Sequence, residues 1–439
     1  MTLYPLRRGA TGAHPPRSLV LVSIDWTRPK DPRVPLGHAS LLAALCDAGV
    51  AVTPGSFAVT DPGFSTDRVI AWVLDQVAGD PGRDLGIGAY IWNEPYIQTI
   101  LPELRRRGFR GRIILGGPQI SYQSHGLEKF YPDADVFVRG YGERALIAIM
   151  QTRGEPVIEG VHWAGGPDRA SIARPDLATL PSPFLDGHIA LTPDRRFIRW
   201  ESKRGCPYRC SFCQHREPGA RLKARDLGLP RLRDEIALFA GSQVDDIAVL
   251  DPVFNMGRDY LAVLDEFHRV GYRGRLSLQC RFEALDTGFL RISQPLDARL
   301  EFGLQTIHPE EGRAIQRMTK PAVVDRAITQ LHAHDQRFEV SLIYGLPNQT
   351  LASFHETVDA CLRWRIPVIR AFPLMLLRGT ELERDRERWG LVENDELIPA
   401  VVASHSFDRD DWRQMAATAT LLDAHAGDYP GRIAELLAR

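Results

Sequence analysis

Three cysteines lie close together near the middle of the chain, and their spacing restricts the local fold more than any other feature. Cys206, Cys210 and Cys213 form a C-x₃-C-x₂-C pattern within the segment ESKRGCPYRCSFCQH, residues 201–215. Three thiolates at this spacing, on a loop that contains Gly and Pro, can hold three corners of an iron–sulfur cluster. A cubane cluster takes four ligands, and the other cysteines of the chain are each isolated by tens of residues. One iron is therefore left open to bind a substrate or cofactor.

Two other roles for these cysteines are weighed against a cluster. A zinc site is one, because His215 completes a C-x₃-C-x₂-C-x-H set and structural zinc takes four Cys or His ligands. The surrounding chain does not have the character of a small zinc module, which disfavours this role. Disulfides are disfavoured because six cysteines in 439 residues are sparse and the N-terminus lacks the apolar core of a secretory signal.

Length and charge limit the class of protein. A chain of 439 residues fits two or three domains. Its formal net charge is −1, whereas proteins that grip nucleic acid carry a basic excess, so no nucleic-acid partner is expected. No apolar run reaches the roughly 18–20 residues of a membrane span, so no membrane association is expected either. Unpaired cysteines and an oxygen-sensitive cluster predict a cytoplasmic protein.

The first part of the chain alternates strand and helix patterns, which predicts an α/β fold with a doubly wound parallel sheet over residues 18–150. Residues 1–17 are rich in Pro, Arg and Gly and are predicted to form a disordered arm. Such a sheet binds ligands beyond the carboxyl ends of its strands, where glycine turns allow a close approach. The candidate ligand-binding residues at this edge are Tyr90, Asn93, Gly116, Gly117, Gly140, Gly142 and Glu143.

A second α/β region follows a predicted linker at 151–195, whose prolines favour an extended path. Six strand patterns separated by helices over residues 196–380 predict a partial (β/α)₆ barrel, whose chemistry lies at the carboxyl ends of its strands. Residues 381–439 are predicted to form a short helical extension. Polar or glycine residues stand at several strand ends. They are Asp251, Pro252, Asn255, Arg281, Glu301, Gln305 and Gly345.

The segment RGCPYRCSFC resembles the cluster loop of the radical S-adenosylmethionine (SAM) superfamily. This resemblance implies that a [4Fe–4S] cluster bound by Cys206, Cys210 and Cys213 chelates SAM at its open iron. One electron from the cluster then splits SAM and releases a 5′-deoxyadenosyl radical. The electron comes from a flavodoxin, a ferredoxin or a dedicated reductase.

The resemblance also implies roles in SAM binding for residues of the cluster loop and the strand ends. Phe212 matches the aromatic residue beside adenine, and the turn from Asp251 through Pro252 to Asn255 matches the segment that meets the SAM amino group. Arg281 suits the SAM carboxylate, because a guanidinium–carboxylate pair can be bidentate. Glu301 and Gln305 suit the ribose hydroxyls. Backbone groups and an apolar wall for adenine are assigned to Ile343, Gly345 and Leu346.

The N-terminal region resembles the cobalamin-binding domain of the B12-dependent radical SAM subfamily, on the segments LGGPQIS and VRGYGE. The sequence departs from one pattern, because it contains no D-x-H-x-x-G segment to supply a histidine to cobalt. His38 lies within a predicted helix and is interpreted as a helix residue. The resemblance thus implies the domain, while some members of the subfamily keep it without using cobalamin.

Together these features predict a radical SAM enzyme acting on a small-molecule, natural-product or sugar-like substrate. One branch is C-methylation with cobalamin, and the other is radical dehydration, epimerisation or rearrangement without it. Tyr208 in the cluster loop is a weak candidate for a catalytic proton donor and is expected to pack instead. Alternatives from other classes are a non-catalytic iron–sulfur or B12-sensing protein and an enzyme that modifies tRNA or protein.

Overall fold

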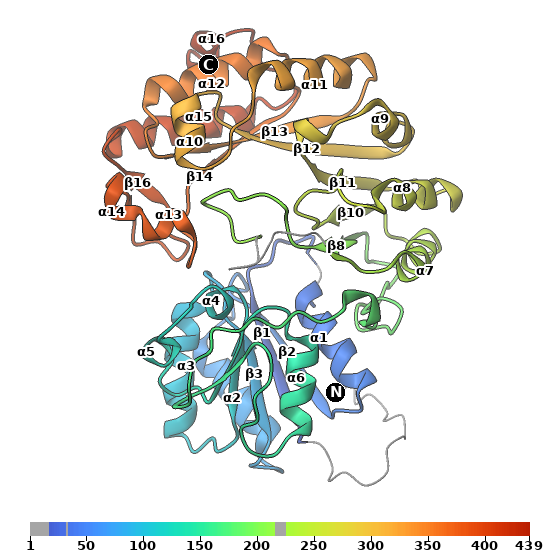
Figure 1. Cartoon of the computed structure of the whole chain (residues 1–439), viewed down its shortest axis with the longest axis vertical. Helices are drawn as coiled ribbons and strands as arrows, with labels where there is room; N and C mark the ends of the chain where they lie inside the picture. Colours follow the sequence, from blue (N-terminus) through green and yellow to red (C-terminus); the bar gives the residue numbers. More distant parts are fainter. Residues whose placement is uncertain (1–16, 32–33, 216–224) are drawn as a thin grey trace. The chain divides into compact units, whose positions relative to one another are not determined.

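The computed structural model describes residues 17–31, 34–215 and 225–439. The chain divides into two compact units, residues 1–195 and 196–439, which appear in blue to green and in green to red in Figure 1. None of the helices that the structure describes combines the length and apolar character that a membrane crossing requires. Each unit is built on its own six-stranded sheet.

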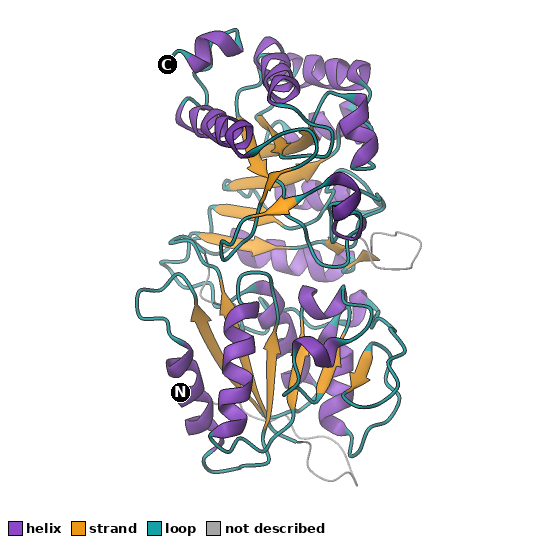
Figure 2. Ribbon diagram, turned by 90° about the vertical axis from the view of Figure 1, so that its left-hand side faces the viewer, coloured by secondary structure: helices purple, strands orange, loops and turns teal. Residues whose placement is uncertain are grey.

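The first unit is the predicted doubly wound sheet, with strand order β2-β1-β3-β4-β5-β6. Its first five strands are parallel. Apolar residues of α2 and α3 pack on one face and those of α1 and α6 on the other, so helices cover both sides (Figure 2). The bounds are β1 Leu19–Asp25, α1 Leu36–Asp47, β2 Val52–Ala58, α2 Thr66–Val77, β3 Asp84–Gly88, α3 Glu94–Arg106, β4 Ile113–Gly116, α4 Pro118–Ser121, α5 Leu127–Phe130, β5 Val136–Val138, α6 Gly142–Gln151, β6 Val161–Trp163 and the 3₁₀ helix Leu177–Thr179.

Two predicted boundaries of this unit are wrong. The segment 151–195 is no linker, because it belongs to the first unit and contributes β6, which pairs antiparallel with β5. The predicted disordered arm ends one residue too late, since the guanidinium of Arg17 binds the carboxylate of Asp84 at 2.7 Å. The rest of that arm, residues 1–16, lies outside the described residues.

The second unit contains the predicted partial barrel, an all-parallel sheet of order β14-β13-β12-β11-β10-β7. Strand residues alternate between a fully buried face and a half-exposed face, as β13 shows. Its bounds are β7 Phe197–Trp200, β8 Lys203–Arg204, β9 Arg225–Asp226, α7 Leu229–Ala240, β10 Asp246–Val249, α8 Tyr260–Arg269, β11 Arg275–Cys280, the 3₁₀ helix Phe282–Ala284, α9 Thr287–Ser293, β12 Asp297–Gln305, α10 Pro309–Ala314, α11 Pro321–Ala333, β13 Phe338–Tyr344, α12 Leu351–Arg363 and β14 Ile369–Pro373.

The C-terminal region is helical, as predicted, and also contains a short hairpin of two antiparallel strands. Its longest helix packs beside β14 and α12, so this region covers the end of the barrel sheet. The bounds are α13 Glu381–Arg384, α14 Arg386–Trp389, β15 Val392–Glu393, β16 Val401–Ala403, α15 Arg409–Ala424 and α16 Ile433–Leu437.

Candidate active site

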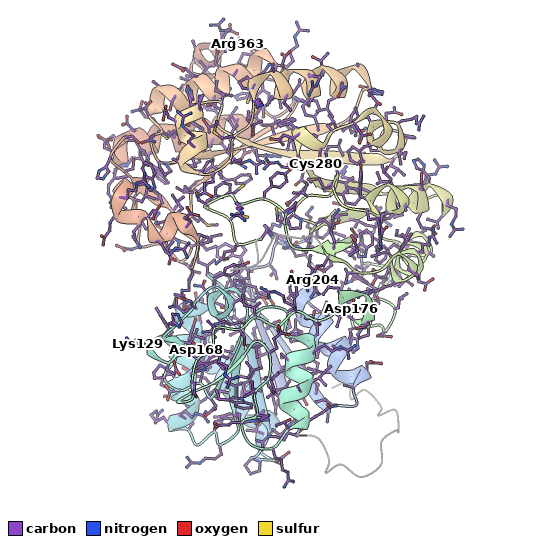
Figure 3. All side chains as sticks on the ribbon, in the orientation of Figure 1. Lys129, Asp168, Asp176, Arg204, Cys280 and Arg363 are labelled. Carbon is purple, nitrogen blue, oxygen red and sulfur yellow. The ribbon has the colours of Figure 1, made fainter. Side chains whose placement is uncertain are left out.

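The three cysteines lie on a loop that leaves β8 at the carboxyl side of the barrel strand β7. β8 pairs antiparallel with β9, so the chain that leaves the loop returns beside the chain that enters it. Gly205 precedes the first cysteine with φ +85, a backbone conformation that side chains disfavour. Arg204, which ends β8, is labelled in Figure 3 and its guanidinium binds Glu201 of the same loop at 2.7 Å.

The cysteine thiols share one environment but do not converge on a single point. Burial raises the pKa of Cys206, and it raises that of Cys213 to about 11, with further raising by the neighbouring cysteines. Within residues 17–31, 34–215 and 225–439, no three His, Cys, Asp or Glu side chains close around one metal-ion position. A zinc ion requires such convergence, whereas a cubane binds each thiolate at a different iron. The three thiols, one buried and two half-buried on one loop, are donors of the kind that a cluster takes.

The middle of the loop is pinned by two helices of the same unit. Ser211 donates its N–H to Ile315 at 2.9 Å, and its carbonyl oxygen accepts the N–H of Leu382 at 3.0 Å. Its hydroxyl donates to the carbonyl oxygen of Ala314 at 3.3 Å. Gln214 adds a bond from its side-chain amide to the carbonyl oxygen of Arg378 at 2.8 Å. The segment around the second and third cysteines is therefore held from outside the loop.

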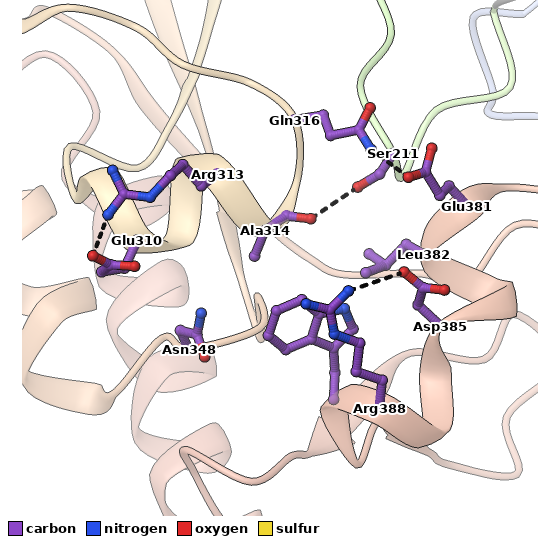
Figure 4. Close-up of a pocket in the computed structure, with 11 residues that line it drawn as sticks. Ser211, Glu310, Arg313, Ala314, Gln316, Asn348, Glu381, Leu382, Asp385 and Arg388 are labelled. Carbon is purple, nitrogen blue, oxygen red and sulfur yellow. Dashed lines mark hydrogen bonds and ion pairs between the residues drawn. The ribbon is translucent and has the colours of Figure 1, made fainter.

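Ser211 also lines a polar pocket of about 210 Å³. Figure 4 shows it between α10, which carries Glu310 and Arg313, and the α13–α14 segment, which carries Asp385 and Arg388. Ser211 directly follows Cys210 in the sequence, so the pocket is lined by a neighbour of a cluster cysteine.

Asp251, assigned above to SAM binding, faces the cluster loop's entry strand. Its carboxylate accepts the N–H of Ser202 at 2.7 Å and that of Lys203 at 3.2 Å, and it also accepts the Ser202 hydroxyl. Asp251 is fully buried, and burial raises its pKa to about 6 against the opposing effect of Lys203 and these hydrogen bonds. The carboxylate thus fastens the turn after β10 to the residues that enter the cluster loop. Pro252 beside it is half-buried.

Asn255 fastens the same turn to the end of β11. Its side-chain amide donates to the carbonyl oxygen of Arg281 at 3.0 Å, and the Arg281 N–H donates back to its Oδ1 at 2.9 Å. Arg281 directly follows Cys280, which Figure 3 labels at the end of β11. This paired contact fixes the backbone from which the Arg281 guanidinium extends.

The Arg281 side chain lies beside the cluster loop. Its Cζ stands 3.9 Å from the centroid of the Tyr208 ring, while Nε and Nη2 donate to Glu283 at 3.0 and 3.2 Å. Nη1 is buried and has no hydrogen-bond partner among the described residues. The Tyr208 hydroxyl approaches the sulfur of Met256 at 3.1 Å, so the contacts of Tyr208 are with Arg281 and Met256, and its predicted packing against the cluster stays a prediction.

A second arginine, Arg317, reaches the cluster loop and was missed by sequence reasoning. Its Nη1 donates to the sulfur of Cys210 at 3.6 Å and its Nη2 to the carbonyl oxygen of Gly303, while Nε is buried without a partner. Burial and the positive charge of Arg281 lower the pKa of Arg317. In the sequence, Arg317 is one arginine in the short connection between α10 and α11. It lies away from any strand end, so no pattern marked it as a binding residue.

The end of β12 is compressed against Arg317. A Cβ on Gly303 would lie 2.6 Å from Gln305 Nε2 and 2.9 Å from Arg317 Nη2, so a larger residue would have to displace the ends of these two side chains. Gln305 has φ +71 at a register shift of the strand, and its Oε1 is buried without a partner. Glu301, half-exposed, stands earlier on the same strand. Phe212 of the cluster loop is half-buried.

The end of β13 is closed by Gln349, another residue that sequence reasoning missed. Its Oε1 accepts the N–H groups of Gly345 at 2.7 Å and Leu346 at 3.2 Å, and its Nε2 donates to Ile343 at 3.2 Å. Gly345 takes φ +89. These backbone N–H groups, assigned above to adenine, are therefore already bound within the protein, which leaves the half-exposed Ile343 side chain as the apolar surface there.

In the first unit, the predicted edge residues mainly stabilise the sheet. Asn93 accepts the Tyr90 N–H at 2.8 Å and donates to the carbonyl oxygens of Ile24 and Gly88 at 2.8 and 2.9 Å. Tyr90 stacks on Trp92 with ring centroids 4.6 Å apart. The edge thus carries an aromatic pair on a rigid turn.

The edge glycines are required by the protein's own backbone. Gly117 has φ +90, and a Cβ there would lie 2.6 Å from the Ala89 carbonyl oxygen. Gly140 has φ +85 and is similarly close to Ala173. The remaining predicted edge residues are Gly116, which ends β4, Gly142, which begins α6, and the buried Glu143.

His38 lies inside α1, as interpreted from the sequence. Its Nε2 is buried without a partner, and burial lowers its pKa to about 4, so the ring is neutral at physiological pH.

Residues 200–361 match the radical SAM superfamily, which covers all three loop cysteines and the strand ends from β10 to β13. The matched segment thus contains the cluster loop whose cysteine spacing resembles that of this superfamily.

Two curated relatives are methyltransferases. The cobalamin-dependent radical SAM methyltransferase TokK of Streptomyces tokunonensis is 28% identical over 305 residues, covering 63% of this chain and 44% of TokK. The 2-(S-pantetheinyl)-carbapenam-3-carboxylate methyltransferase of Streptantibioticus cattleyicolor is 30% identical over 236 residues, covering 50% of this chain and 34% of that protein. The chain therefore matches less than half of the length of either relative.

Solved structures share the fold across both units. TsrM from Kitasatospora setae, a radical SAM methyltransferase solved with cobalamin and a [4Fe–4S] cluster, has a TM-score of 0.66 at 18% identity, covering 87% of this chain and 78% of TsrM. OxsB, a cobalamin-dependent SAM radical enzyme solved with aqua-cobalamin, has a TM-score of 0.67 at 14% identity, covering 92% of this chain and 67% of OxsB.

Proposed function

We propose that this chain, whose second unit carries a radical SAM domain, is a cobalamin-dependent radical SAM methyltransferase that methylates a carbon of a small molecule. When bound, the cluster supplies the electron that splits SAM to a 5′-deoxyadenosyl radical, and the corrinoid supplies the methyl group. Methylation is favoured over dehydration because both curated relatives near 30% identity are named methyltransferases.

The observation that carries the proposal is the pair of arginines beside the cluster loop. Arg281 Nη1 and Arg317 Nε are buried donors without partners, and Arg317 also contacts a cluster cysteine. A buried guanidinium N–H that lacks an acceptor is costly even where the rest of the group is bonded, so an anion is expected beside these nitrogens. The carboxylate of SAM bound at the open iron is such an anion, and Gln305 Oε1 offers an acceptor to a hydroxyl nearby.

The residues of the SAM site divide into those that face the ligand and those that hold the site. Arg281, Arg317, Gln305 and Phe212 are proposed to contact SAM, with Glu301 and Ile343 on the half-exposed face of the sheet. Asp251, Asn255 and Gln349 are proposed to hold the loops around it, because their polar atoms are bonded within the protein. Pro252, Gly345 and Leu346 belong to these held turns.

Cobalamin is proposed to bind the first unit at the carboxyl edge of its sheet. The stacked Tyr90 and Trp92 offer an aromatic surface, and the turns at Gly117 and Gly140 present backbone without side chains. Gly116, Gly142 and Glu143 stand at the same strand and helix ends. His38 is proposed to remain unligated, since it is interior to α1.

The substrate is proposed to be a small natural-product scaffold, in line with the carbapenam named for one relative. The electron donor is proposed to be a small redox protein (a flavodoxin, a ferredoxin or a dedicated reductase) in the cytoplasm. We propose that the electron donor docks at the pocket that Ser211 lines, because Ser211 is adjacent in sequence to the cluster cysteine Cys210.

The test is anaerobic incubation of the reconstituted protein with methyl-labelled SAM, dithionite and cobalamin. We expect 5′-deoxyadenosine, a corrinoid absorption spectrum that persists through gel filtration, and label on the corrinoid. Production of 5′-deoxyadenosine without corrinoid retention would reject methylation and leave a radical SAM enzyme of another outcome. Absence of both products would reject the proposal entirely.

A further inference from the structure

Lys203, the first residue of β8, is a buried cation that holds the turn after β10. It is 3% exposed, and its Nζ donates to the carbonyl oxygen of Phe254 at 2.8 Å and to that of Met256. The ammonium also lies 5.5 Å from the Phe254 ring centroid and 5.9 Å from that of Tyr260. A lysine is almost never fully buried without such compensation.

The turn that Lys203 holds has no regular structure of its own. Residues 250–259 lie between β10 and α8 without helix or strand, and Phe254 donates its N–H to Gln279 at 2.6 Å. The carbonyl oxygens of such a turn need donors from elsewhere. Lys203 supplies them from the strand that leads directly into the cluster loop, three residues before Cys206.

These contacts form a closed circuit between the cluster loop and Arg281. Lys203 holds Phe254 and Met256, and Asn255 between them fixes the backbone of Arg281 through two hydrogen bonds. The Arg281 guanidinium lies on the Tyr208 ring, and the Tyr208 hydroxyl returns to Met256. The contacts thus begin at Lys203 in β8, before Cys206, and return at Tyr208 in the cluster loop, after it.

We propose that Lys203 is a positioning residue for SAM: it sets the Arg281 guanidinium relative to the cluster loop through the turn and Asn255. This inference rests on the proposed function, because it takes the SAM carboxylate as the ligand of Arg281 Nη1. Lys203 acts through backbone carbonyl oxygens, so its loss displaces the donor for SAM without removing a cluster ligand. The effect therefore falls on the KM for SAM.

The experiment uses Lys203→Met, which keeps the stem and removes the ammonium. We expect the KM for SAM in dithionite-driven 5′-deoxyadenosine formation to rise roughly ten- to a hundredfold, as a small misplacement of a binding group can cause. Iron content, and the rate at saturating SAM per cluster, should stay within about twofold. Lys320→Met, at an exposed lysine before α11, is the control and should match wild type.

Asn255→Ala breaks the next link of the circuit and should raise the same KM. Because both residues act through one path, the double variant should be little worse than the worse single variant. If Lys203→Met loses its cluster, Lys203→Gln, which keeps one donor, replaces it in the same comparison and should show a smaller rise in KM.

Three results would overturn the inference. They are an unchanged KM in a variant that keeps its cluster, a rate that falls only in proportion to iron content, and additive effects with Asn255→Ala. A wild-type protein that fails to cleave SAM would instead count against the proposed function, so the two failures are distinguishable.

Discussion

The carboxyl edges of the two sheets use their polar groups differently. In the first unit, Asn93 bonds its side chain to strands of the same sheet, and the buried unpartnered imidazole of His38 is neutral. In the second unit, Arg281 and Arg317 leave buried guanidinium nitrogens without partners. A neutral ring costs little when buried, whereas a buried guanidinium N–H without an acceptor costs more, even where the other nitrogens of the group are bonded, as Arg281 is to Glu283. The second unit therefore has buried charged donors to offer to an anion, and the first offers a surface of aromatic rings and glycine backbone.

The largest expected effect removes the cluster on which the charged site depends. Cys210→Ala should lower 5′-deoxyadenosine formation by at least about a thousandfold, because a cubane bound by two thiolates is not retained. Iron and sulfide content and anaerobic absorption spectra measure the loss.

Cys46→Ala, in α1 of the first unit, is the matched control. It should keep both the cluster and SAM cleavage. Full activity in Cys210→Ala would contradict the assignment of the cluster to this loop.

The next effect tests the buried guanidinium groups directly. Arg317→Met should lower kcat/KM for SAM cleavage roughly a hundredfold, since charge-assisted hydrogen bonds contribute about 1.5–3 kcal/mol each. Arg317→Lys keeps a positive charge but not the donor geometry, and should recover only part of the loss. Steady-state 5′-deoxyadenosine assays at several SAM concentrations give both constants.

Arg313→Met provides the comparison, because this exposed arginine pairs only locally with Glu310 on α10. It should leave kcat/KM for SAM unchanged with dithionite. An Arg317→Met variant with wild-type kcat/KM would mean that the buried guanidinium has a structural role alone.

The contrast between the two edges also explains what the sequence could and could not reveal. The cysteine spacing and the strand–helix alternation are local patterns, so the fold class, the loop and the position of Arg281 were predictable. Arg317, Gln349 and Lys203 were missed because their roles arise from tertiary contacts and not from strand ends. Asp251 was assigned to a ligand although its carboxylate faces Ser202, since strand position does not determine which way a side chain is bonded.

The boundary near residue 151 was misjudged for a related reason. β6 has only three residues, Val161–Trp163, in a segment rich in Pro and Gly. So short a strand has no readable periodicity, and its antiparallel pairing with β5 depends on the sheet already being present.

A smaller effect is expected at the edge of the first unit. Gly117→Ala places a Cβ 2.6 Å from the Ala89 carbonyl oxygen at φ +90, so the turn must shift away from its present path. We expect cobalamin affinity to fall about tenfold or more, while uncoupled SAM cleavage by the second unit persists. Equilibrium dialysis with cobalamin and 5′-deoxyadenosine assays measure the two properties.

Gly108→Ala is the control, because that glycine also has positive φ but a Cβ added there would meet no atom within 4 Å. It should retain cobalamin. Equal retention by Gly117→Ala would remove the turn from the corrinoid site, and loss of SAM cleavage would show that the variant disturbs more than the first unit.

The smallest effect on SAM cleavage is expected at Asp84, whose charge stabilises the fold of the first unit. Its carboxylate is fully buried between Arg17 and Arg112, at 2.7 and 2.6 Å. Asp84→Asn should lower the free energy of unfolding of this unit by about 2–3 kcal/mol, because it leaves two guanidinium groups without their anion. SAM cleavage should be unchanged at temperatures where the unit stays folded.

The contribution of Asp84 to the free energy of unfolding should depend on pH in a definite direction. Burial opposes ionisation of Asp84, but the hydrogen bonds from Arg17 and Arg112 outweigh it and lower the pKa below 3.8. The stabilisation is therefore present above about pH 4 and is lost as the pH falls through the lowered pKa. Denaturant unfolding followed by tryptophan fluorescence should show the difference between wild type and Asp84→Asn shrinking below pH 4. A constant difference would mean that packing, and not charge, is what Asp84 contributes, and the contrast with the buried guanidinium nitrogens of the second unit would lose its electrostatic basis.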